Sequence, residues 1–370
     1  MKVAYMFGSL NRGGAETLML DVFRNFCKKN IEIFGIYRKN GALLDDFIKT
    51  NTPLSQIKPH FIIDPVYILQ LRKTLKKNHI NIIHAHQAID AIYAKIACIG
   101  LEIKVVLTFH GYNYKYGKLN NFLTQKIINR TDLNIYVSRS QRKRYSEKYF
   151  VKNEIKQIVI YNGISFEKLN NIKQTSLRHE NNIPKSSLLL GSVGNFVPVR
   201  DQLTICKALD ILDKNSIDFA FIFAGAKSKS YPQLYDDCVN FCNINKISDK
   251  VHFLGSRNDI PNILHQLDAF VYSTNHDTFG IALIEAIASG VPVFYNDHEV
   301  LEEVCQNGEL GIMYKSKNFN DIFNKFMDYL GNKKYYIDKA QADALRVEQM
   351  YDIENHINKL EEEYLAIHDS

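Results

Sequence analysis

Two carboxylates, Asp277 and Glu285, are separated by seven residues at a place where a helix should follow a strand. The apolar run 269–273 ahead of them is typical of a short buried strand. From Gly280 onward, apolar residues recur three and four positions apart, which predicts a helix that carries Glu285 and ends before Gly290. Carboxylates accept hydrogen bonds from hydroxyl groups, so this pair has the chemistry to hold two sets of sugar hydroxyls.

A simpler interpretation of the pair stays open. Asp277 would then only cap the helix N-terminus, and Glu285 would only lie on a solvated helix face. The functional interpretation draws on position, because ligands of open α/β sheets bind outside the carboxyl ends of the strands. Helix N-termini at that edge favour anionic groups such as phosphates.

Glycines and charged or histidine side chains follow several other predicted strands. Gly13 and Gly14 would let backbone N–H groups approach an anion closely, and Arg200 can bind a phosphate with its planar guanidinium. His86 and His110 each follow a strand as well. Single residues of these kinds are also common as structural histidines or surface charges, so the sequence alone leaves both roles open.

Apolar runs and helical patterns alternate along the whole chain, which is typical of parallel sheets with helices on both faces. At 370 residues, the chain is long enough for two domains. Helices are expected at residues 66–77, 88–99 and 349–367, and the polar stretch 166–185 is expected to connect the domains. Strands are expected at residues 2–8, 31–37, 61–63, 80–84, 104–109, 132–137, 188–194, 220–225, 251–255, 269–273 and 291–295.

Seven motifs resemble, in order, those of the large retaining glycosyltransferase family with the GT-B fold (group 1 type). They are Gly-Gly-Ala-Glu at 13–16, Thr-Phe-His-Gly at 108–111, Asn-Gly at 162–163, Gly-Asn with a following arginine at 194–200, Leu-Gly-Ser-Arg at 254–257, the Asp…Glu pair at 277–285 and Gly-Val-Pro at 290–292. The chain departs from the family pattern at three positions. Asp277 stands where the family has Glu, Asn195 where it has a cation, and Ser165 where it has Asp.

This resemblance implies an α/β fold of GT-B architecture, with two Rossmann-like, doubly wound parallel-sheet domains facing a central cleft. The domains would be residues 1–164 and 165–349, and a terminal helix at about 350–370 would cross back onto the first. It also implies catalytic roles for His110, Arg200 and Asp277. The substrate-binding residues that it implies are Gly13, Gly14, His86, Asn195, Arg257, Phe279, Gly280 and Glu285.

Within that set, the resemblance places the donor sugar's hydroxyls on Asp277, the ribose on Glu285 and the base near Arg257. The donor diphosphate would lie between Arg200 and Gly14. The sequence contains no Asp-x-Asp, which argues against a metal-dependent glycosyltransferase, so neither a metal nor a cofactor is expected. A nucleotide-diphospho-sugar, with UDP-sugar as the first choice, is expected as donor, and retention at the anomeric carbon is implied.

Charge is unevenly distributed along the chain. Residues 1–164 contain 26 Lys and Arg against 11 Asp and Glu, a net +15, whereas residues 165–370 contain 20 against 29, a net −9. Basic clusters at 72–77 and 139–144 would suit an anionic membrane surface, a polyprenyl-diphosphate-linked glycan acceptor or nucleic acid, although a solvated basic face fits equally well. The acidic second half and the absence of basic–aromatic interleaving count against nucleic acid.

The sequence therefore predicts a retaining glycosyltransferase that acts on a hydroxyl acceptor in bacterial surface polysaccharide or lipid-linked glycan assembly. Two alternatives remain: a GT-B-type nucleotide-sugar epimerase and a non-enzymatic nucleic-acid-binding protein. Six scattered cysteines suggest reduced thiols, and no apolar run approaches the ~20 residues of a membrane span. A cytoplasmic location, peripheral on the inner face of the plasma membrane, is expected.

Overall fold

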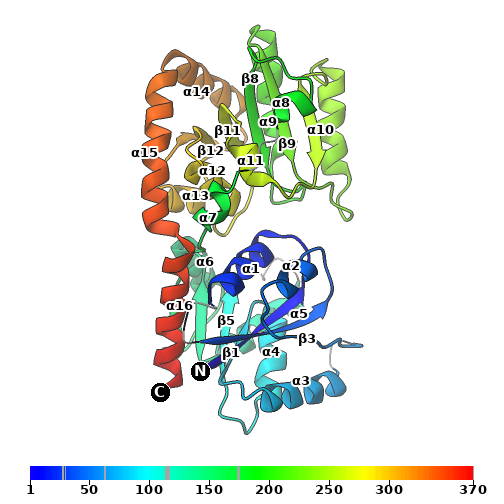
Figure 1. Cartoon of the computed structure of the whole chain (residues 1–370), viewed down its shortest axis with the longest axis vertical. Coiled ribbons are helices and arrows are strands. Elements are labelled where there is room, and N and C mark those ends of the chain that lie inside the picture. Colours follow the sequence, from blue (N-terminus) through cyan, green and yellow to red (C-terminus); the bar gives the residue numbers. More distant parts are fainter. Residues whose placement is uncertain (27–28, 30, 62–63, 113–116, 173–175, 370) are drawn as a thin grey trace. The chain divides into compact units, whose positions relative to one another are not determined.

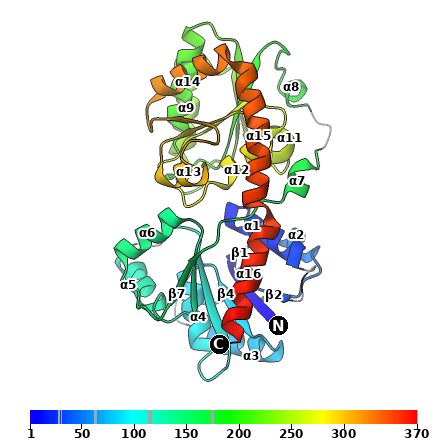
Figure 2. The ribbon, with the colours of Figure 1, turned by 90° about the vertical axis from the view of Figure 1, so that its left-hand side faces the viewer.

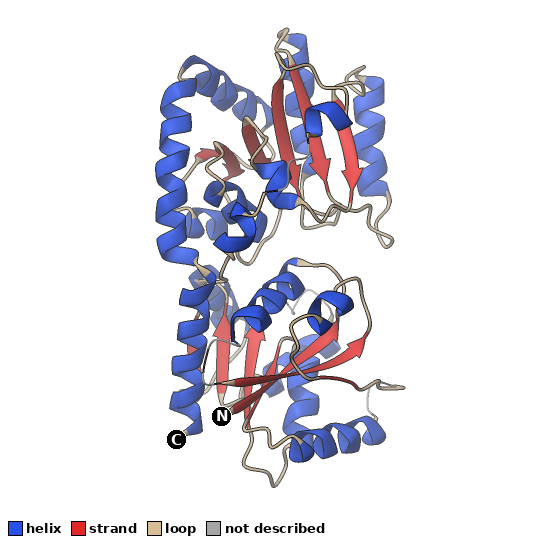
Figure 3. Cartoon of the chain, in the orientation of Figure 1, coloured by secondary structure: helices blue, strands red, loops and turns tan. Residues whose placement is uncertain are grey.

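A computed structural model describes the chain except for residues 27–28, 30, 62–63, 113–116, 173–175 and 370. The chain divides into two compact units (Figure 1). The first unit comprises Met1–Ile164 together with Tyr351–Ser370, and the second unit comprises Ser165–Met350. Each unit is built around one parallel sheet with helices packed on it (Figure 3).

The sheet of the first unit has seven strands in the order β3-β2-β1-β4-β5-β6-β7. β1 pairs in parallel with both β2 and β4, so the direction of winding reverses between β1 and β4. This reversal is the topological switch point of a doubly wound sheet, where ligands bind outside the strand ends. The strands are β1 (Lys2–Ser9), β2 (Glu32–Lys39), β3 (Leu54–Gln56), β4 (Ile82–Ala85), β5 (Lys104–Phe109), β6 (Leu133–Tyr136) and β7 (Lys156–Val159).

Strict alternation along β1 explains how helices cover both faces of this sheet. Tyr5 packs in one core with residues of α1 and α16, whereas Met6 packs in another core with residues of α3 and α4. Figure 2 shows α16, the last helix of the chain, lying along this unit. The helices are α1 (Gly14–Phe26), α2 (Leu44–Ile48), α3 (Pro65–Lys77), α4 (Ala88–Ala97), α5 (Lys118–Ile127), α6 (Arg139–Lys148) and α16 (Ile353–His368).

The second unit repeats the plan with six parallel strands in the order β10-β9-β8-β11-β12-β13, and its switch point lies between β8 and β11. The strands are β8 (Leu188–Val193), β9 (Phe219–Ala224), β10 (Val251–Gly255), β11 (Ala269–Tyr272), β12 (Val293–Asn296) and β13 (Ile312–Tyr314). The helices are α7 (Phe166–Asn170), α8 (Leu177–Glu180), α9 (Gln202–Lys214), α10 (Gln233–Ile244), α11 (Ile260–Leu264), α12 (Ile281–Ala288), α13 (Glu299–Val304), α14 (Phe319–Gly331) and α15 (Lys333–Tyr351).

Most expected elements occur within a few residues of their predicted bounds, and two differ. The structure adds a strand that was not predicted, β3, in which Leu54 pairs with Gly35 of β2. Of the strand expected at 61–63, the structure describes Phe61 alone. Phe61 is exposed, and residues 62–63 lie outside the described part. The stretch 166–185 is not a plain connection, because it contains α7 and α8 within the second unit. Phe166 and Leu169 anchor α7 by their burial.

The return of the terminal segment changes the charge balance of the units. Residues 351–370 contribute one Lys against six Asp and Glu, so the first unit carries a net +10 and the second a net −4. The strongest charge asymmetry in the sequence is therefore reduced, but not removed, by the fold. No helix in the described part of the chain is long and apolar enough to cross a lipid bilayer. Among the described residues, five cysteines are free and buried: Cys98, Cys206, Cys238, Cys242 and Cys305.

Candidate functional site

In the second unit, the loops after β8 and β11 meet at the switch point. Arg200 and Thr274 form an isolated antiparallel bridge between these loops. The hydroxyl of Thr274 also donates a hydrogen bond to the carbonyl oxygen of Val199 (2.6 Å). These contacts hold the backbones of the two loops together, so the side chains that the loops carry are held in one geometry.

Arg200 and Asp277 form the charged centre of this edge. Arg200 Nη1 donates to Asp277 Oδ2 at 3.2 Å, and the guanidinium carbon lies 4.3 Å from the ring centroid of Tyr272. Tyr272 Oη donates to the same carboxylate oxygen at 2.5 Å. Burial lowers the pKa of Arg200 and the neighbouring carboxylate opposes that shift, so the guanidinium remains a cation. Both residues are candidates from the sequence, but the sequence does not indicate that they pair.

The other oxygen of Asp277 caps the turn that leads into α12. Asp277 Oδ1 accepts hydrogen bonds from the backbone N–H groups of Thr278 (2.7 Å), Phe279 (3.2 Å) and Gly280 (3.1 Å). Asp277 is therefore a cap for the backbone and a partner for Arg200 at once. The helix itself begins after its N-cap Gly280, which has no side-chain cap, so Asp277 caps the turn before α12 and not the helix N-terminus that the simpler interpretation predicted.

The remaining residues of this segment are arranged around α12. Gly280 has φ 85°, a left-handed conformation that favours glycine, and the helix begins directly after it. Phe279 is buried at 1 % exposure, which places its ring in the core. Glu285 lies in α12 and is partly exposed. Gly290, with φ 71°, follows the helix end as predicted.

Two further candidates of the second unit have protein partners. Asn195, in the loop after β8, is exposed, and its Oδ1 accepts a hydrogen bond from the N–H of Ala226 (2.8 Å). Arg257 follows the edge strand β10 and donates to both carboxylate oxygens of Asp259 (2.8 and 2.6 Å) and to Glu180 (3.3 Å). The hydrogen bonds with Asp259 raise the pKa of Arg257. Because β9 and β8 separate β10 from β11, Arg257 is not at the switch point.

In the first unit, the Gly-Gly turn leads from β1 into α1. The helix begins at Gly14, and the carbonyl oxygen of Gly13 accepts the N–H of Thr17 (2.9 Å). A side chain at position 13 would meet the carboxylate of Glu16, because a Cβ atom there would lie 2.5 Å from Oε2. Burial raises the pKa of Glu16. This carboxyl lines the neighbouring pocket and was missed as a candidate, although the Gly-Gly-Ala-Glu motif contains it.

That pocket has a volume of about 380 Å³ and lies at the first unit's switch point. Its polar lining includes Ser9 at the end of β1, Glu16 of α1, His86 after β4 and His110 after β5. His86 Nδ1 and His110 Nε2 are 3.0 Å apart, so the two rings share one N–H in a hydrogen bond. The structure thus brings His86, His110 and the loop beside Gly13 to one edge of the sheet.

Withdrawal from solvent keeps both imidazoles neutral. It lowers the pKa of His110 to about 3, with the nearby His356 as a second cause, and it lowers the pKa of His86 well below its ordinary value. Among the described residues, His86 Nε2 is buried without a hydrogen-bond partner. Such a nitrogen costs about 1–3 kcal/mol unless a ligand group pairs with it.

Behind the two histidines, the terminal helix contributes to the same edge. Tyr364 of α16 lies 2.7 Å from the hydroxyl of Tyr5 and 2.5 Å from His84 Nδ1, and His84 Nε2 lies 2.7 Å from the hydroxyl of Thr108. This buried chain joins β1, β4 and β5 to α16. The sequence contains no signal that pairs His84 with a residue 280 positions away. The part of the chain that the structure describes contains no cluster of three or more His, Cys, Asp or Glu that could hold a metal ion.

Comparison with known proteins agrees with this architecture. Residues 173–343 match the family model of glycosyl transferases group 1, and residues 12–168 match that of glycosyltransferase family 4. The chain is 24 % identical over 349 residues to the O-antigen biosynthesis glycosyltransferase WclY of Escherichia coli, covering 88 % of this chain and 92 % of that protein. It is 23 % identical over 338 residues to an E. coli UDP-Gal:α-D-GlcNAc-diphosphoundecaprenol α-1,3-galactosyltransferase, covering 86 % and 85 %.

Among solved structures, Anabaena HepE in complex with UDP and glucose superimposes with a TM-score of 0.88 at 17 % identity, covering 99 % of this chain and all of that one. The likeness confirms the predicted GT-B fold, with one Rossmann-like sheet in each unit. The two family models account for one unit each, and together they leave only the chain ends and a few residues between them unmatched. The chain belongs to the group 1 glycosyltransferase family.

Proposed function

We propose that this glycosyltransferase is a retaining, metal-independent enzyme that transfers a hexosyl group from a UDP-sugar to a hydroxyl of a glycan acceptor. The observation that carries the proposal is the partly buried Arg200–Asp277–Tyr272 cluster at the second unit's switch point. It supplies one fixed positive charge where the fold class binds the phosphates of a nucleotide.

The cluster suits a diphosphate because Arg200 is held in one orientation while it still has N–H donors available. Within the described residues, its guanidinium donates only the one side-chain hydrogen bond to Asp277, so further N–H donors remain for phosphate oxygens. A Cβ atom at Gly194 would lie 3.2 Å from Arg200 Nε, so glycine keeps that side of the guanidinium open. Both oxygens of Asp277 are already engaged, and we therefore assign Asp277 to positioning Arg200 and not to direct sugar contact.

The first unit would receive sugar hydroxyls. Neutral imidazoles accept and donate hydrogen bonds to hydroxyl groups without attracting a counter-ion, which matches His86 and His110. Glu16 adds a carboxyl to the same pocket. In the second unit, Glu285 keeps the ribose role that its position in the family motif implies.

In the proposed reaction, the bond between the sugar's anomeric carbon and the β-phosphate oxygen breaks, and the acceptor oxygen bonds to that carbon from the same face. The acceptor's proton passes to the leaving phosphate oxygen, and Arg200 stabilises the charge that develops on the diphosphate. No metal is invoked, so activity should persist in the presence of a chelator.

The relatives support the choice of substrates. One is named as a galactosyltransferase that uses UDP-Gal and a diphosphoundecaprenol-linked sugar, another acts in O-antigen biosynthesis, and HepE was solved with UDP and glucose. By analogy, we propose a UDP-sugar donor and an acceptor from cell-surface glycan assembly, with the enzyme on the cytoplasmic face of the membrane.

The test is a screen of nucleotides and nucleotide-sugars by thermal shift, followed by transfer assays with the donor that binds. We expect UDP and UDP-sugars to stabilise the protein selectively. We also expect NMR to show the same anomeric configuration in the product as in the donor. Binding of no nucleotide would refute the proposal, and an inverted product would refute retention. Conversion of the donor to a new sugar without any acceptor would identify an epimerase instead.

A further inference from the structure

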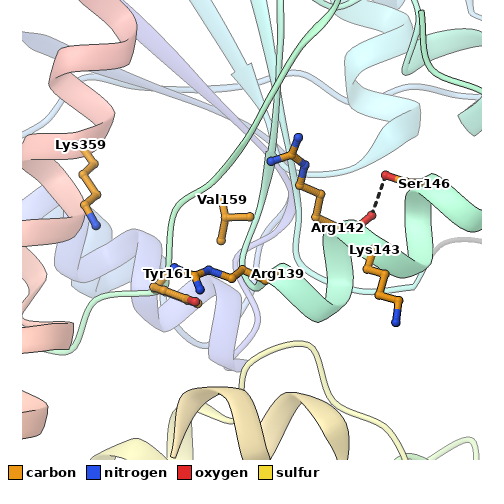
Figure 4. A pocket seen from close by; sticks show the side chains of 7 residues that line it. All are labelled: Arg139, Arg142, Lys143, Ser146, Val159, Tyr161 and Lys359. Atoms are coloured by element: carbon orange, nitrogen blue, oxygen red, sulfur yellow. Dashed lines mark hydrogen bonds between the residues drawn. The ribbon is translucent and has the colours of Figure 1, made fainter. Parts of the chain in front are cut away.

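The first unit contains a second pocket, and cations dominate its lining. This pocket has a volume of about 480 Å³, within the range of small-molecule sites. Its lining residues are Arg139, Arg142, Lys143, Ser146, Val159, Tyr161 and Lys359. Figure 4 shows Arg139 extending from the start of α6 toward Tyr161, and Lys359 extending toward the same region from α16. The pocket is therefore built from segments about 200 positions apart in sequence.

The pocket lies at the same edge of the sheet as the histidines. Arg139 opens α6, directly after the carboxyl end of β6, and Tyr161 follows the carboxyl end of β7. His110 follows β5, which is the neighbour of β6. With strands about 4.8 Å apart, the end of β7 lies roughly 10 Å from the end of β5. A sugar that carries a phosphate group can span that distance along the sheet edge.

Three cations of this pocket are not used to bind protein carboxylates. Within the described residues, the side chains of Arg142, Lys143 and Lys359 form no ion pair, and no Asp or Glu lines the pocket. Lys359 is the only Lys or Arg in α16, a helix that also contains four glutamates. One of them, Glu363, is one turn from Lys359 but pairs with Lys156 of β7 at 2.5 Å. The pocket therefore keeps a positive potential that an anionic ligand would satisfy.

We propose that this pocket binds the phosphate or diphosphate group that the acceptor carries, while the acceptor's sugar hydroxyl lies at His86 and His110. Arginine guanidinium groups bind phosphate oxygens in a bidentate manner, and lysine ammonium groups add charge without geometric constraint. The inference rests on the proposed transferase function and names the acceptor class: a sugar linked to phosphate, and not a neutral glycan.

The first experiment measures the affinity of inorganic diphosphate for protein saturated with UDP, so that the donor site is already filled. The double variant Arg142→Gln/Lys359→Gln should bind diphosphate at least about tenfold more weakly than the wild type. Lys148→Gln, which removes an exposed cation from α6 outside the pocket, should leave the affinity unchanged. Equal affinities in the wild type and the double variant would overturn the proposal.

Kinetics with two acceptors then test the function of the pocket. With a short-chain alkyl-diphospho-sugar, the double variant should show a KM raised about tenfold at similar kcat, whereas the alkyl glycoside of the same sugar should show no change. A rise in KM for both acceptors would overturn the proposal. UDP affinity, measured in the same samples, should be unaltered. If the wild type binds diphosphate here but binds no UDP, the proposed function fails, and the acceptor assignment fails with it.

A lipid headgroup presents the same chemistry from another source. Sedimentation with vesicles of phosphatidylglycerol and phosphatidylcholine distinguishes an acceptor phosphate from a lipid headgroup. If the pocket binds the acceptor, the wild type and the double variant should sediment with the vesicles to the same extent. Loss of vesicle binding in the double variant, with the acceptor KM unchanged, would assign the pocket to membrane lipid and overturn the proposal.

Discussion

The two switch points share one topology and differ in their electrostatics. In the first unit, the edge between β1 and β4 presents the neutral imidazoles of His86 and His110. In the second unit, the edge between β8 and β11 presents a fixed ion pair of Arg200 and Asp277. The same sheet order therefore supports a hydrogen-bonding edge in one unit and a charged edge in the other.

This difference indicates that the fold supplies a position and the loops supply the chemistry. Desolvation acts on both edges with opposite outcomes. Imidazoles lose their proton easily and become neutral on burial, whereas an arginine keeps its charge and needs a carboxylate beside it. The units should accordingly respond differently to pH, to charge removal and to loss of a cap.

The largest effect is expected from acid. In the folded first unit, burial lowers the pKa of His110 to about 3 and of His356 to about 4, and it lowers those of His84 and His86 well below 6.5. Once unfolded, these groups bind protons below about pH 6.5, so their stabilising contribution is full above that value and is lost as pH falls. Asp90 acts in the opposite direction, because burial raises its pKa to about 7.

Four imidazoles oppose two carboxyls, Asp90 and Glu16, whose pKa burial raises, so unfolding of the first unit takes up protons below about pH 6.5 and its stability falls with pH there. The measurement is urea unfolding at about pH 7 and at about pH 5, followed by pulsed hydrogen exchange. Peptides from β5 and β11 report on the first and the second unit, respectively. The β5 peptide should lose protection at a lower urea concentration at the acidic pH, with a smaller change for β11. An unchanged midpoint for β5 would contradict the neutral-histidine interpretation.

The next largest effect is expected from removing the fixed charge. Arg200→Gln should lower kcat/KM for a UDP-sugar by about 10²–10³-fold, since one preorganised donor to the leaving group is lost. Arg200→Lys should recover only part of this activity, because an ammonium cannot keep the stacked, planar contact with Tyr272. Steady-state kinetics with both variants are the measurement. Near-normal turnover by Arg200→Gln would remove the second unit's charged edge from the mechanism.

A smaller effect is expected from substitutions that distinguish the roles of the two carboxylate oxygens of Asp277. Asp277→Asn keeps an oxygen that can accept the N–H groups of the turn but loses the charge beside Arg200, so activity should fall while stability is nearly retained. Asp277→Ala should lose activity and, in addition, about 1–2 kcal/mol of unfolding free energy, because the cap is gone. Thermal or urea unfolding together with kinetics distinguishes them. Equal stability of the two variants would show that the cap contributes little.

The fold was largely predictable from local pattern. β5 and β10 have their predicted bounds because each is a run rich in β-forming residues between polar or glycine positions. β3 has no such run: Leu54–Gln56 is a short edge strand whose pairing with β2 is a tertiary contact. The strand predicted at 61–63 falls mostly on residues outside the described part of the chain, and Phe61 is exposed.

The candidate site was predictable only as separate loops. Residue types at strand ends identified His110, Arg200 and Asp277, because the carboxyl edge of a parallel sheet is where ligands bind. Arg200 and Asp277 are 77 positions apart, and their pairing depends on the order of the strands in the sheet, which local pattern does not give. The same is true of Tyr364 in α16, whose place beside His84 follows from the return of the terminal helix.

The smallest effect is expected at Arg257, and it distinguishes the family motif from the geometry. The motif predicts a contact with the base, whereas the structure pairs Arg257 with Asp259 and Glu180 on a partly exposed edge. If the pairing describes its whole role, Arg257→Gln should cost at most about 1 kcal/mol of stability and leave the affinity for UDP nearly unchanged. Titrations with UDP and ADP decide the matter, because a residue that contacts the base would alter the ratio of the two affinities on substitution. A changed ratio would mean that Arg257 leaves its carboxylates when a nucleotide binds, and the second unit would then hold the donor through a mobile cation as well as the fixed one at Arg200.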